Sequence, residues 1–321
     1  MSTEISNLVV LLQSISQYLY RYGGLFQVIF GTIGCVLNII VFSRKNLRKN
    51  PCAVYFLAVN IFDFLFINSL LLAITLESGY NIFLTTKSLF LCHLCYYTSL
   101  FANVLSTYCL ILASIDRVLI TSSKVTIRQR SNLRLSYIYL IIGTVFWLLF
   151  HSPAWFFTTI TEVNENNFMC FYEIGSYLVF ISFYSIIKES SSIILLILFG
   201  LWAVKNIRRL HRVTLPTISL QSRINRAEGT YKINPKDQQF VSMVLIDIII
   251  FSICSSMAAI FLTHQQITQY ENKSFEQIQI SIFLKEITVF CLHIPFSTSC
   301  YTNLIVSKAY RKAMKNVFLC N

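Results

Sequence analysis

The chain has 321 residues, of which 55% are hydrophobic and only 12% are charged, and its formal net charge is +12. Ordinary soluble domains carry about 25% charged residues, so this composition excludes a soluble globular protein. The 27 Phe and 17 Tyr, against 9 Gly and 5 Pro, exclude a disordered or collagen-like chain. A polytopic membrane protein remains, and its length allows several crossings of about 20 residues each.

Seven apolar stretches follow one another along the chain, each about long enough to cross a bilayer as a helix. They cover residues 25–42, 53–74, 89–120, 136–157, 175–204, 239–262 and 278–306. The sequence therefore predicts an all-α membrane protein with a seven-transmembrane helix bundle over residues 25–306. Residues 1–24 are expected to form an extracellular N-terminal tail, and residues 307–321 a short amphipathic cytoplasmic helix, parallel to the membrane, with a tail.

Basic residues lie mainly on one side of these stretches. Of the 26 Lys and Arg, 21 lie at the end of the first, third, fifth or seventh stretch or in the segment that follows it. By the positive-inside rule the N-terminus lies outside and the C-terminus in the cytoplasm, so we expect a multi-pass protein of the plasma membrane. The net charge then reports topology and predicts no nucleic-acid partner. Asn272 begins an Asn-Lys-Ser sequon in an outer loop, which predicts N-glycosylation unless the match arises by chance.

Polar residues interrupt the first two stretches. A charge within the hydrocarbon costs about 2.5–3.5 kcal/mol on insertion scales, so Asp63, near the middle of the second stretch, has to face the bundle interior. Asn38 follows Gly31 and Gly34, which let a neighbouring helix approach closely enough for a hydrogen bond across the interface. The alternative for Asn38 is a packing seam of small residues.

The third stretch ends in two opposite charges and carries a polar residue near its middle. Asp116 and Arg117 close it where the basic loop begins, and adjacent opposite charges at a helix end can hold each other. A pair of solvated charges at a helix end is the alternative. Ser106 lies eleven residues before Arg117, about three helical turns, on the same helix.

Two cysteines are predicted to form a disulfide on the outer side. Cys92 lies twenty-five residues before Arg117, at the outer end of the third stretch, and Cys170 lies in the outer loop after the fourth. The outside is oxidising, so these two thiols can form a bridge that holds the loop across the mouth of the bundle. Cys95, one helical turn along, is the alternative partner for Cys170.

Taken together, these residues resemble the rhodopsin-like (class A) family of G-protein-coupled receptors, over about residues 25–318. The matching features are Gly34 with Asn38, Asp63, Cys92 with Ser106, Asp116-Arg117-Val118, Trp147 and Cys170. The resemblance implies a receptor that transmits the binding of an extracellular ligand to a heterotrimeric G protein, with arrestin and membrane lipid as further partners. It also implies a polar centre of Asn38, Asp63 and Ser106 that holds a sodium ion; a protonated Asp63 is the alternative.

At the cytoplasmic side the same resemblance points to a coupling switch and a lipid-modified tail. We expect Arg117 to pair with Asp116 at rest and to take Tyr301, from the seventh stretch, as a new partner when the fifth and sixth stretches move outward. Residues 307–312 look like the family's short helix along the membrane. Cys320 is then a palmitoylation site, or otherwise a free terminal thiol.

Three stretches depart from the family's pattern. The fifth has no proline, and the sixth lacks the Cys-Trp-x-Pro switch, with Met257 near the place of its proline. The seventh lacks Asn-Pro-x-x-Tyr, and Pro295 lies a little upstream of that place. These departures concern the usual activation mechanism and leave the expected fold unchanged, because membrane helices also bend without proline.

The ligand class follows by elimination. Amine receptors of the family place an acid where this chain has Ser99, and opsins place a lysine deeper in the seventh stretch than Lys285. A peptide remains, and Lys236 to Gln239 is similar to the entry of the sixth span in invertebrate FMRFamide-like peptide receptors. Predicted depth selects six candidates for the ligand pocket, which are Tyr96, Tyr97, Ser99, Asn103, Lys285 and Glu286.

A transporter or channel is the alternative function. Lys188 and Glu189 in the fifth stretch and Asp247 in the sixth are intramembrane charges of the kind that line ion pathways. The sequence shows no internal repeat, which disfavours this alternative. Catalysis is not expected, because no spaced metal ligands, glycine-rich phosphate loop or paired nucleophile and base occur. Beyond sodium, no metal or cofactor is expected.

Overall fold

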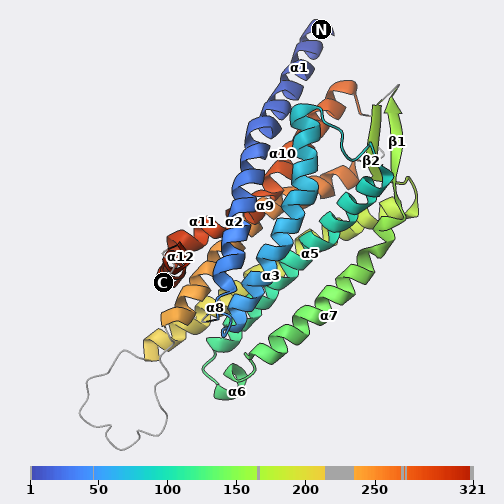
Figure 1. Ribbon diagram of the computed structural model, residues 1–321. Coiled ribbons are helices and arrows are strands. Elements are labelled where there is room, and N and C mark those ends of the chain that lie inside the picture. Colours follow the sequence, from blue (N-terminus) through green and yellow to red (C-terminus); the bar gives the residue numbers. More distant parts are fainter. Residues whose placement is uncertain are drawn as a thin grey trace, which may run out of the picture.

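The computed structural model describes residues 2–45, 47–164, 167–213, 235–268, 271 and 273–318 (Figure 1). In these residues, seven helices are long and apolar enough to cross a membrane. The seven spans are Asn7–Phe42, Pro51–Gly79, Leu89–Ile120, Leu133–Trp155, Ser176–Arg209, Asp237–Ile267 and Phe275–Val306. Each overlaps one predicted apolar stretch, so the prediction of a helical, multi-pass membrane bundle is confirmed.

The first span is longer than the sequence predicts. Residues 2–24, expected as a tail, are helical: α1 (Ser2–Tyr18) and a π-helical turn (Leu19–Gly24) lead directly into α2 (Leu25–Phe42). A side-chain carbon on Gly24 would lie 2.6 Å from the Thr75 hydroxyl, so glycine is what allows the first two spans to approach this closely. Tyr20 is buried here and its hydroxyl donates to the Glu286 carbonyl oxygen at 2.9 Å.

The second span begins at a capped helix end, and the third span, which follows it, is the central helix of the bundle. The Asn50 side chain accepts from the Cys52 amide, Pro51 takes the first helical position, and α3 (Pro51–Phe66) follows. Two π-helical turns (Ile67–Leu71 and Thr75–Gly79) flank α4 (Leu72–Ile74). Next comes α5 (Leu89–Ile120), which packs against α3, α7, α8 and α9.

The fourth span leads into a β-hairpin. After α6 (Val125–Arg128) and α7 (Leu133–His151) comes a short 3₁₀ turn (Ser152–Trp155). Then β1 (Thr158–Asn164) and β2 (Asn167–Tyr172) pair antiparallel, with Thr158 opposite Tyr172 and Ile160 opposite Cys170. Figure 1 places this hairpin at the end of the bundle that also holds the N-terminus. We call this the hairpin end.

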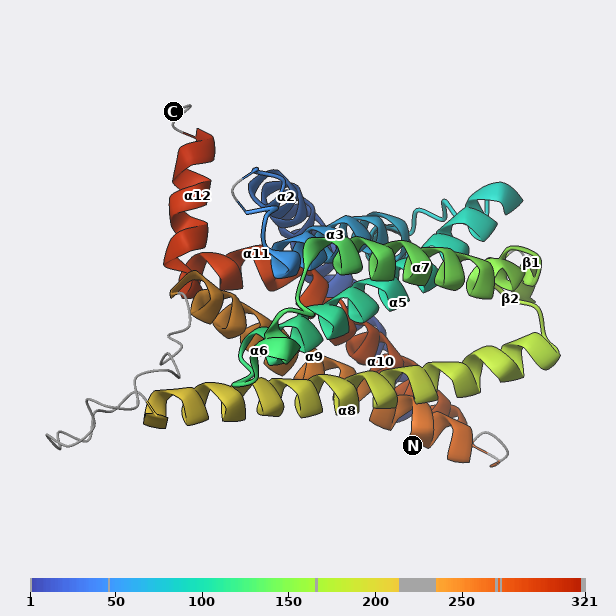
Figure 2. The ribbon, with the colours of Figure 1, turned by 90° about the horizontal axis from the view of Figure 1, so that it is seen from below.

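The last spans are α8 (Ser176–Val213), α9 (Pro235–Ile267) and the pair α10 (Phe275–Leu292) and α11 (Ile294–Val306). The seventh span is interrupted at His293, because Pro295 lacks the amide hydrogen that an unbroken helix needs. At Ser307 the backbone is extended, and α12 (Lys308–Phe318) turns away from α11 across the end of the bundle (Figure 2).

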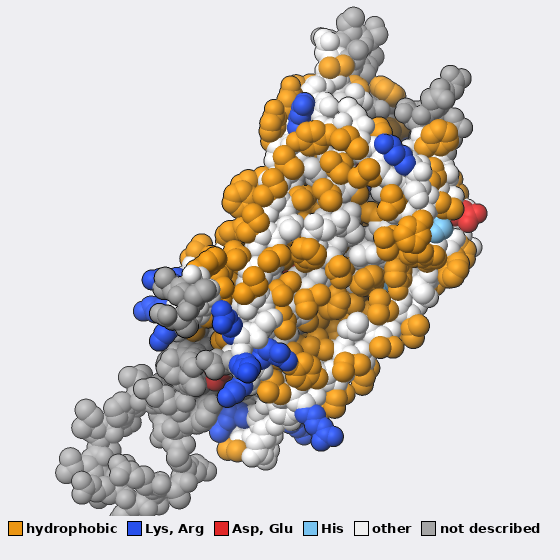
Figure 3. Space-filling view, viewed as in Figure 1, with side chains coloured by type: hydrophobic (Ala, Val, Ile, Leu, Met, Phe, Trp, Pro, Cys, Tyr) orange, Lys and Arg blue, Asp and Glu red, His pale blue; other side chains and the backbone are white. Residues whose placement is uncertain are grey.

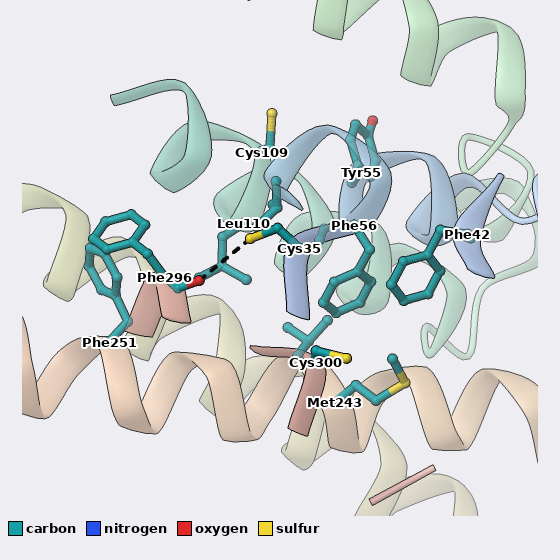
Figure 4. Packing of buried hydrophobic residues seen from close by; sticks show 14 of the residues in the cluster. Cys35, Phe42, Tyr55, Phe56, Cys109, Leu110, Met243, Phe251, Phe296 and Cys300 are labelled. Atoms are coloured by element: carbon teal, nitrogen blue, oxygen red, sulfur yellow. Dashed lines mark hydrogen bonds between the residues drawn. The ribbon is translucent and has the colours of Figure 1, made fainter. Parts of the chain in front are cut away.

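One large apolar core joins most of the spans, and a smaller cluster around Ala154, Tyr172 and Ile181 lies near the hairpin. Figure 4 shows Phe42 of α2 beside Phe56 of α3, and their rings stack with centroids 5.4 Å apart. Farther along the core, the Cys35 thiol donates to the Phe296 carbonyl oxygen, and Phe251 of α9 lies beside Phe296. Contacts among four spans in this cluster explain why the bundle is one unit.

The outer surface is apolar around its middle and basic at one end. Ile141, Leu149 and Ile260 are 63%, 69% and 71% exposed, as expected for side chains that face lipid. Figure 3 shows apolar side chains over the middle of this face, and Lys and Arg gathered at the end that carries α6 and α12. We call this the basic end.

Candidate functional site

A disulfide ties the hairpin to the central helix. Cys92, at the start of α5, is bonded to Cys170 of β2, with Cα atoms 5.8 Å apart and a sequence separation of 78 residues. The predicted pair is confirmed, and the alternative thiol of Cys95 instead donates to the Ser69 carbonyl oxygen at 3.3 Å. Since the Tyr96 hydroxyl also donates to the Cys170 carbonyl oxygen at 2.9 Å, β2 is fixed over α5.

Two pocket candidates approach β2 from different spans. The Tyr96 ring packs edge-on against Tyr172 with centroids 5.2 Å apart, and the Lys285 ammonium lies 5.8 Å from the Phe171 ring centroid. Burial raises the pKa of Tyr172 well above its usual value, so this phenol stays neutral. Aromatic side chains and one cation therefore lie beneath the hairpin.

The other pocket candidates point to different places. The Tyr97 hydroxyl donates to the Leu148 carbonyl oxygen on α7 at 3.1 Å, so Tyr97 faces the fourth span. Ser99 is buried and donates to the backbone of its own helix, to the Tyr96 carbonyl oxygen. Glu286 lines a groove between α1 and α10. These candidates therefore do not line one common pocket, because they lie on different faces of their helices.

The sixth candidate, Asn103, belongs to an intramembrane charge cluster. The Lys188 ammonium forms an ion pair with the Glu189 carboxylate at 2.6 Å and donates to the Asn103 amide oxygen at 2.8 Å. Both charged side chains are less than a tenth exposed. The pair is neutral as a unit, as a buried ion pair has to be, and it links α8 to α5.

A second polar centre lies inside the bundle around Asp63. The Ser106 hydroxyl donates to the Asp63 carboxylate, as the sequence predicts. Both line an internal cavity of about 30 Å³, together with Asp247 of α9 and Ser299 of α11. The Asp247 carboxylate accepts from the Thr302 hydroxyl at 3.2 Å, and the buried Ser299 hydroxyl has no partner among the described residues. Two carboxylates from different spans therefore meet at one small cavity.

Asn38 does not join this centre. Its amide nitrogen donates to the Asn60 side-chain oxygen at 2.6 Å, and its own side-chain oxygen accepts from the Tyr310 hydroxyl. The prediction that Asn38, Asp63 and Ser106 form one centre is therefore wrong for Asn38. The reason is that the chain turns at Ser307 and α12 places Tyr310 against α2, where burial raises the pKa of the Tyr310 phenol.

The basic end is held together around Arg117, whose side chain is fully buried. Arg117 forms the predicted ion pair with Asp116 and donates to the Asn50 side-chain oxygen at 3.1 Å. Its other terminal nitrogen lies 3.6 Å from a carboxylate oxygen of Asp237, in the first turn of α9. Asn50 also donates to Asp237 at 2.9 Å. We call these four residues the Arg117 network; it joins α3, α5 and α9.

Sequence reasoning missed Asp237, and the predicted second partner of Arg117, Tyr301, is not beside it in this structure. The available signal for Asp237 was an acid directly after Lys236 at the end of a basic segment. Tyr301 does not contact Arg117: its hydroxyl donates to the Phe30 carbonyl oxygen at 2.9 Å, so the side chain faces α2. The predicted glycosylation site Asn272 and palmitoylation site Cys320 lie outside the described residues.

No protein-family model matches the sequence, and the search of curated proteins finds no match. Within the described ranges, no group of three or more His, Cys, Asp and Glu side chains is arranged to hold a metal ion. The function therefore has to be inferred from the contacts and charges described above.

Proposed function

We propose that this protein is a rhodopsin-like G-protein-coupled receptor that transmits binding of an extracellular peptide to a heterotrimeric G protein. The observation that supports this most is the Arg117 network. A fully buried guanidinium is shared between Asp116 on its own helix and Asp237 on another span. Such an arrangement allows two states. Asp237 moves with α9, whereas Asp116 stays beside Arg117 on α5, so Arg117 is either paired with both carboxylates or with Asp116 alone.

In the closed state, Arg117 contacts both Asp116 and Asp237, and an outward movement of α9 would break only the second contact. A buried charge without a partner is strongly unfavourable, and Asp116 remains bound to Arg117 if α9 moves away. The more distant contact to Asp237, at 3.6 Å, is then lost. The Phe240 ring, 5.7 Å from the guanidinium, moves with the same helix and uncovers Arg117. The opened basic end is the proposed surface for the G protein, and afterwards for arrestin.

The central helix connects the two ends. Its 32 residues span about 48 Å, and it carries Cys92, Ser106 and Arg117 in that order. A ligand that contacts the hairpin therefore acts on a helix that is covalently bonded to that hairpin and that carries the switch at its far end.

The cavity between them fits the sodium ion that the resemblance implies. Hard cations prefer oxygen ligands, and Asp63, Ser106, Asp247 and the unpartnered Ser299 hydroxyl all line it. A volume of about 30 Å³ exceeds what one water needs. When bound, the ion would compensate the charge of the carboxylates. Protons on Asp63 and Asp247 are the alternative way to remove that charge.

The proposed orientation places the hairpin end outside the plasma membrane and the basic end in the cytoplasm. In that orientation α12 lies along the inner membrane surface. Its Tyr310 and Met314 are buried against the bundle, while Lys308, Lys312 and Lys315 are exposed to water and to lipid headgroups.

Reconstitution separates a receptor from a transporter. The purified protein is placed in liposomes, exposed to a neuropeptide library, and assayed both for nucleotide exchange on added G proteins and for solute flux. Peptide-dependent exchange without flux supports the receptor. Flux driven by a gradient, with no exchange under any peptide, would instead give Lys188, Glu189 and Asp247 the role of an ion path.

A further inference from the structure

A polar groove lies between the N-terminal helix and the seventh span at the hairpin end. It has a cavity volume of about 300 Å³ and is formed by α1, by Ser78 and by α10. Gln13 and Gln17 line it from α1, and Gln279 and Glu286 from α10. The volume is within the range of small-ligand sites. Because α1 forms one wall, the groove exists only if residues before 19 are helical.

The groove carries one uncompensated negative charge. Glu286 is its sole ionisable lining residue, and no ion pair of Glu286 occurs among the described residues. The neighbouring Lys285 points away, since its ammonium lies over the Phe171 ring beneath the hairpin. Arg21, the basic residue closest in sequence to α1, lies over the Tyr80 ring at 5.5 Å. Neither cation therefore pairs with Glu286.

One buried polar atom in the groove also lacks a partner. Ser16 is only 6% exposed and lines the groove, and its hydroxyl oxygen makes no hydrogen bond among the described residues. A buried hydroxyl without a hydrogen-bond partner is unfavourable, so an unpartnered hydroxyl in a groove that Glu286 also lines indicates that a polar ligand supplies the missing contact.

The geometry points to a binding site for the guanidinium group of an arginine in a peptide ligand. A guanidinium offers five N–H donors in a plane, which suit one carboxylate and several amide or hydroxyl oxygens. Glu286 supplies the carboxylate, and Gln13, Gln17, Gln279 and Ser16 supply neutral oxygens. Ile282 and Phe283 supply apolar surface for the arginine stem. This inference rests on the proposed peptide-receptor function and names the chemistry that the ligand presents.

Saturation-transfer NMR on the full-length protein in nanodiscs tests this site without a G protein. The probes are N-acetyl-arginine amide and N-acetyl-citrulline amide, which have the same shape but differ in charge. We expect the arginine probe to bind about tenfold more strongly than the citrulline probe, because neutral citrulline cannot form a charged hydrogen bond with the carboxylate. Glu286→Gln should remove this preference, and Glu286→Asp should retain most of it.

A matched control is Glu271→Gln, which removes an exposed acid of the same end outside the groove and should leave the preference intact. Equal binding of the two probes, an unchanged preference in Glu286→Gln, or an equal loss in Glu271→Gln would each overturn the site. If Glu286→Gln fails to fold, Gln279→Leu takes its place and should weaken binding of the arginine probe. Exchange on G proteins is measured separately, so loss of the groove and loss of the receptor function are distinguishable.

Discussion

If the protein is the receptor proposed above, replacing Asp237 by asparagine should activate it without a ligand. The substitution keeps an oxygen that can accept from Asn50 but removes the charge that lies 3.6 Å from Arg117. At that distance the Coulomb attraction is about 4–5 kcal/mol for an effective dielectric constant of about 20. Desolvation offsets most of this, and Asp116 keeps Arg117 paired, so we expect a net loss of about 1–2 kcal/mol from the closed state.

A change of about 1.4 kcal/mol raises the fraction of protein in the proposed open state about tenfold while that fraction is small. The assay is basal nucleotide exchange on purified heterotrimeric G proteins, one from each α-subunit class, with the receptor in nanodiscs. Asp237→Asn should raise the basal rate severalfold in the class that couples. Asp237→Glu, which keeps the charge, is the control and should stay near the wild-type rate.

The reasoning is refuted if Asp237→Asn folds normally and leaves basal exchange unchanged in every G-protein class. It is refuted equally if Asp237→Glu raises the rate as much as Asp237→Asn does. In that case the packing of α9, and not the charge at position 237, would control the basic end.

Three further substitutions test the other centres. Cys170→Ser opens a loop of 78 residues and should lower the free energy of unfolding by about 4 kcal/mol, seen as a lower melting temperature. Cys95→Ser is its control, and an equal loss there would contradict the assigned pair. Sodium should stabilise the wild type relative to choline, by about 1.4 kcal/mol at ten times its Kd, and Asp63→Asn should abolish that difference. An unchanged sodium effect in Asp63→Asn would show that the ion binds at another site. Tyr310→Phe removes the hydrogen bond to Asn38 and should cost about 1–2 kcal/mol in thermal unfolding, and a change near zero would show that the bond contributes nothing.

The spans and the contacts along or across single helices could be predicted from sequence. Bilayer thickness fixes the length of each apolar run, which is why 89–120 matches α5. Asp116 and Arg117 are neighbours in the chain, so their pairing needs no knowledge of the fold. Asp63 had to face the interior, and helical spacing placed Ser106 at a similar depth.

Contacts between segments that are far apart in the sequence could not be predicted in the same way, because they depend on how the helices are oriented relative to one another. Tyr310 reaches Asn38 only because the chain turns at Ser307, and no periodic pattern reports that angle. Asp237 meets Arg117 across 120 residues of sequence. The N-terminal helix was missed because Val9 to Leu12 is a short apolar run, whereas the helix is stabilised by packing against α10.

The measurement that tests the central claim most directly compares wild type and Arg117→Ala in the same liposomes, with peptide-stimulated nucleotide exchange and solute flux recorded together. Arg117 contributes a buried charge at the basic end, and its ion pairs and hydrogen bonds among the described residues all lie at that end. We predict peptide-stimulated exchange in the wild type, its loss in Arg117→Ala with peptide binding retained, and no flux in either. Undiminished exchange in Arg117→Ala, or flux in the wild type without any exchange, would contradict the account.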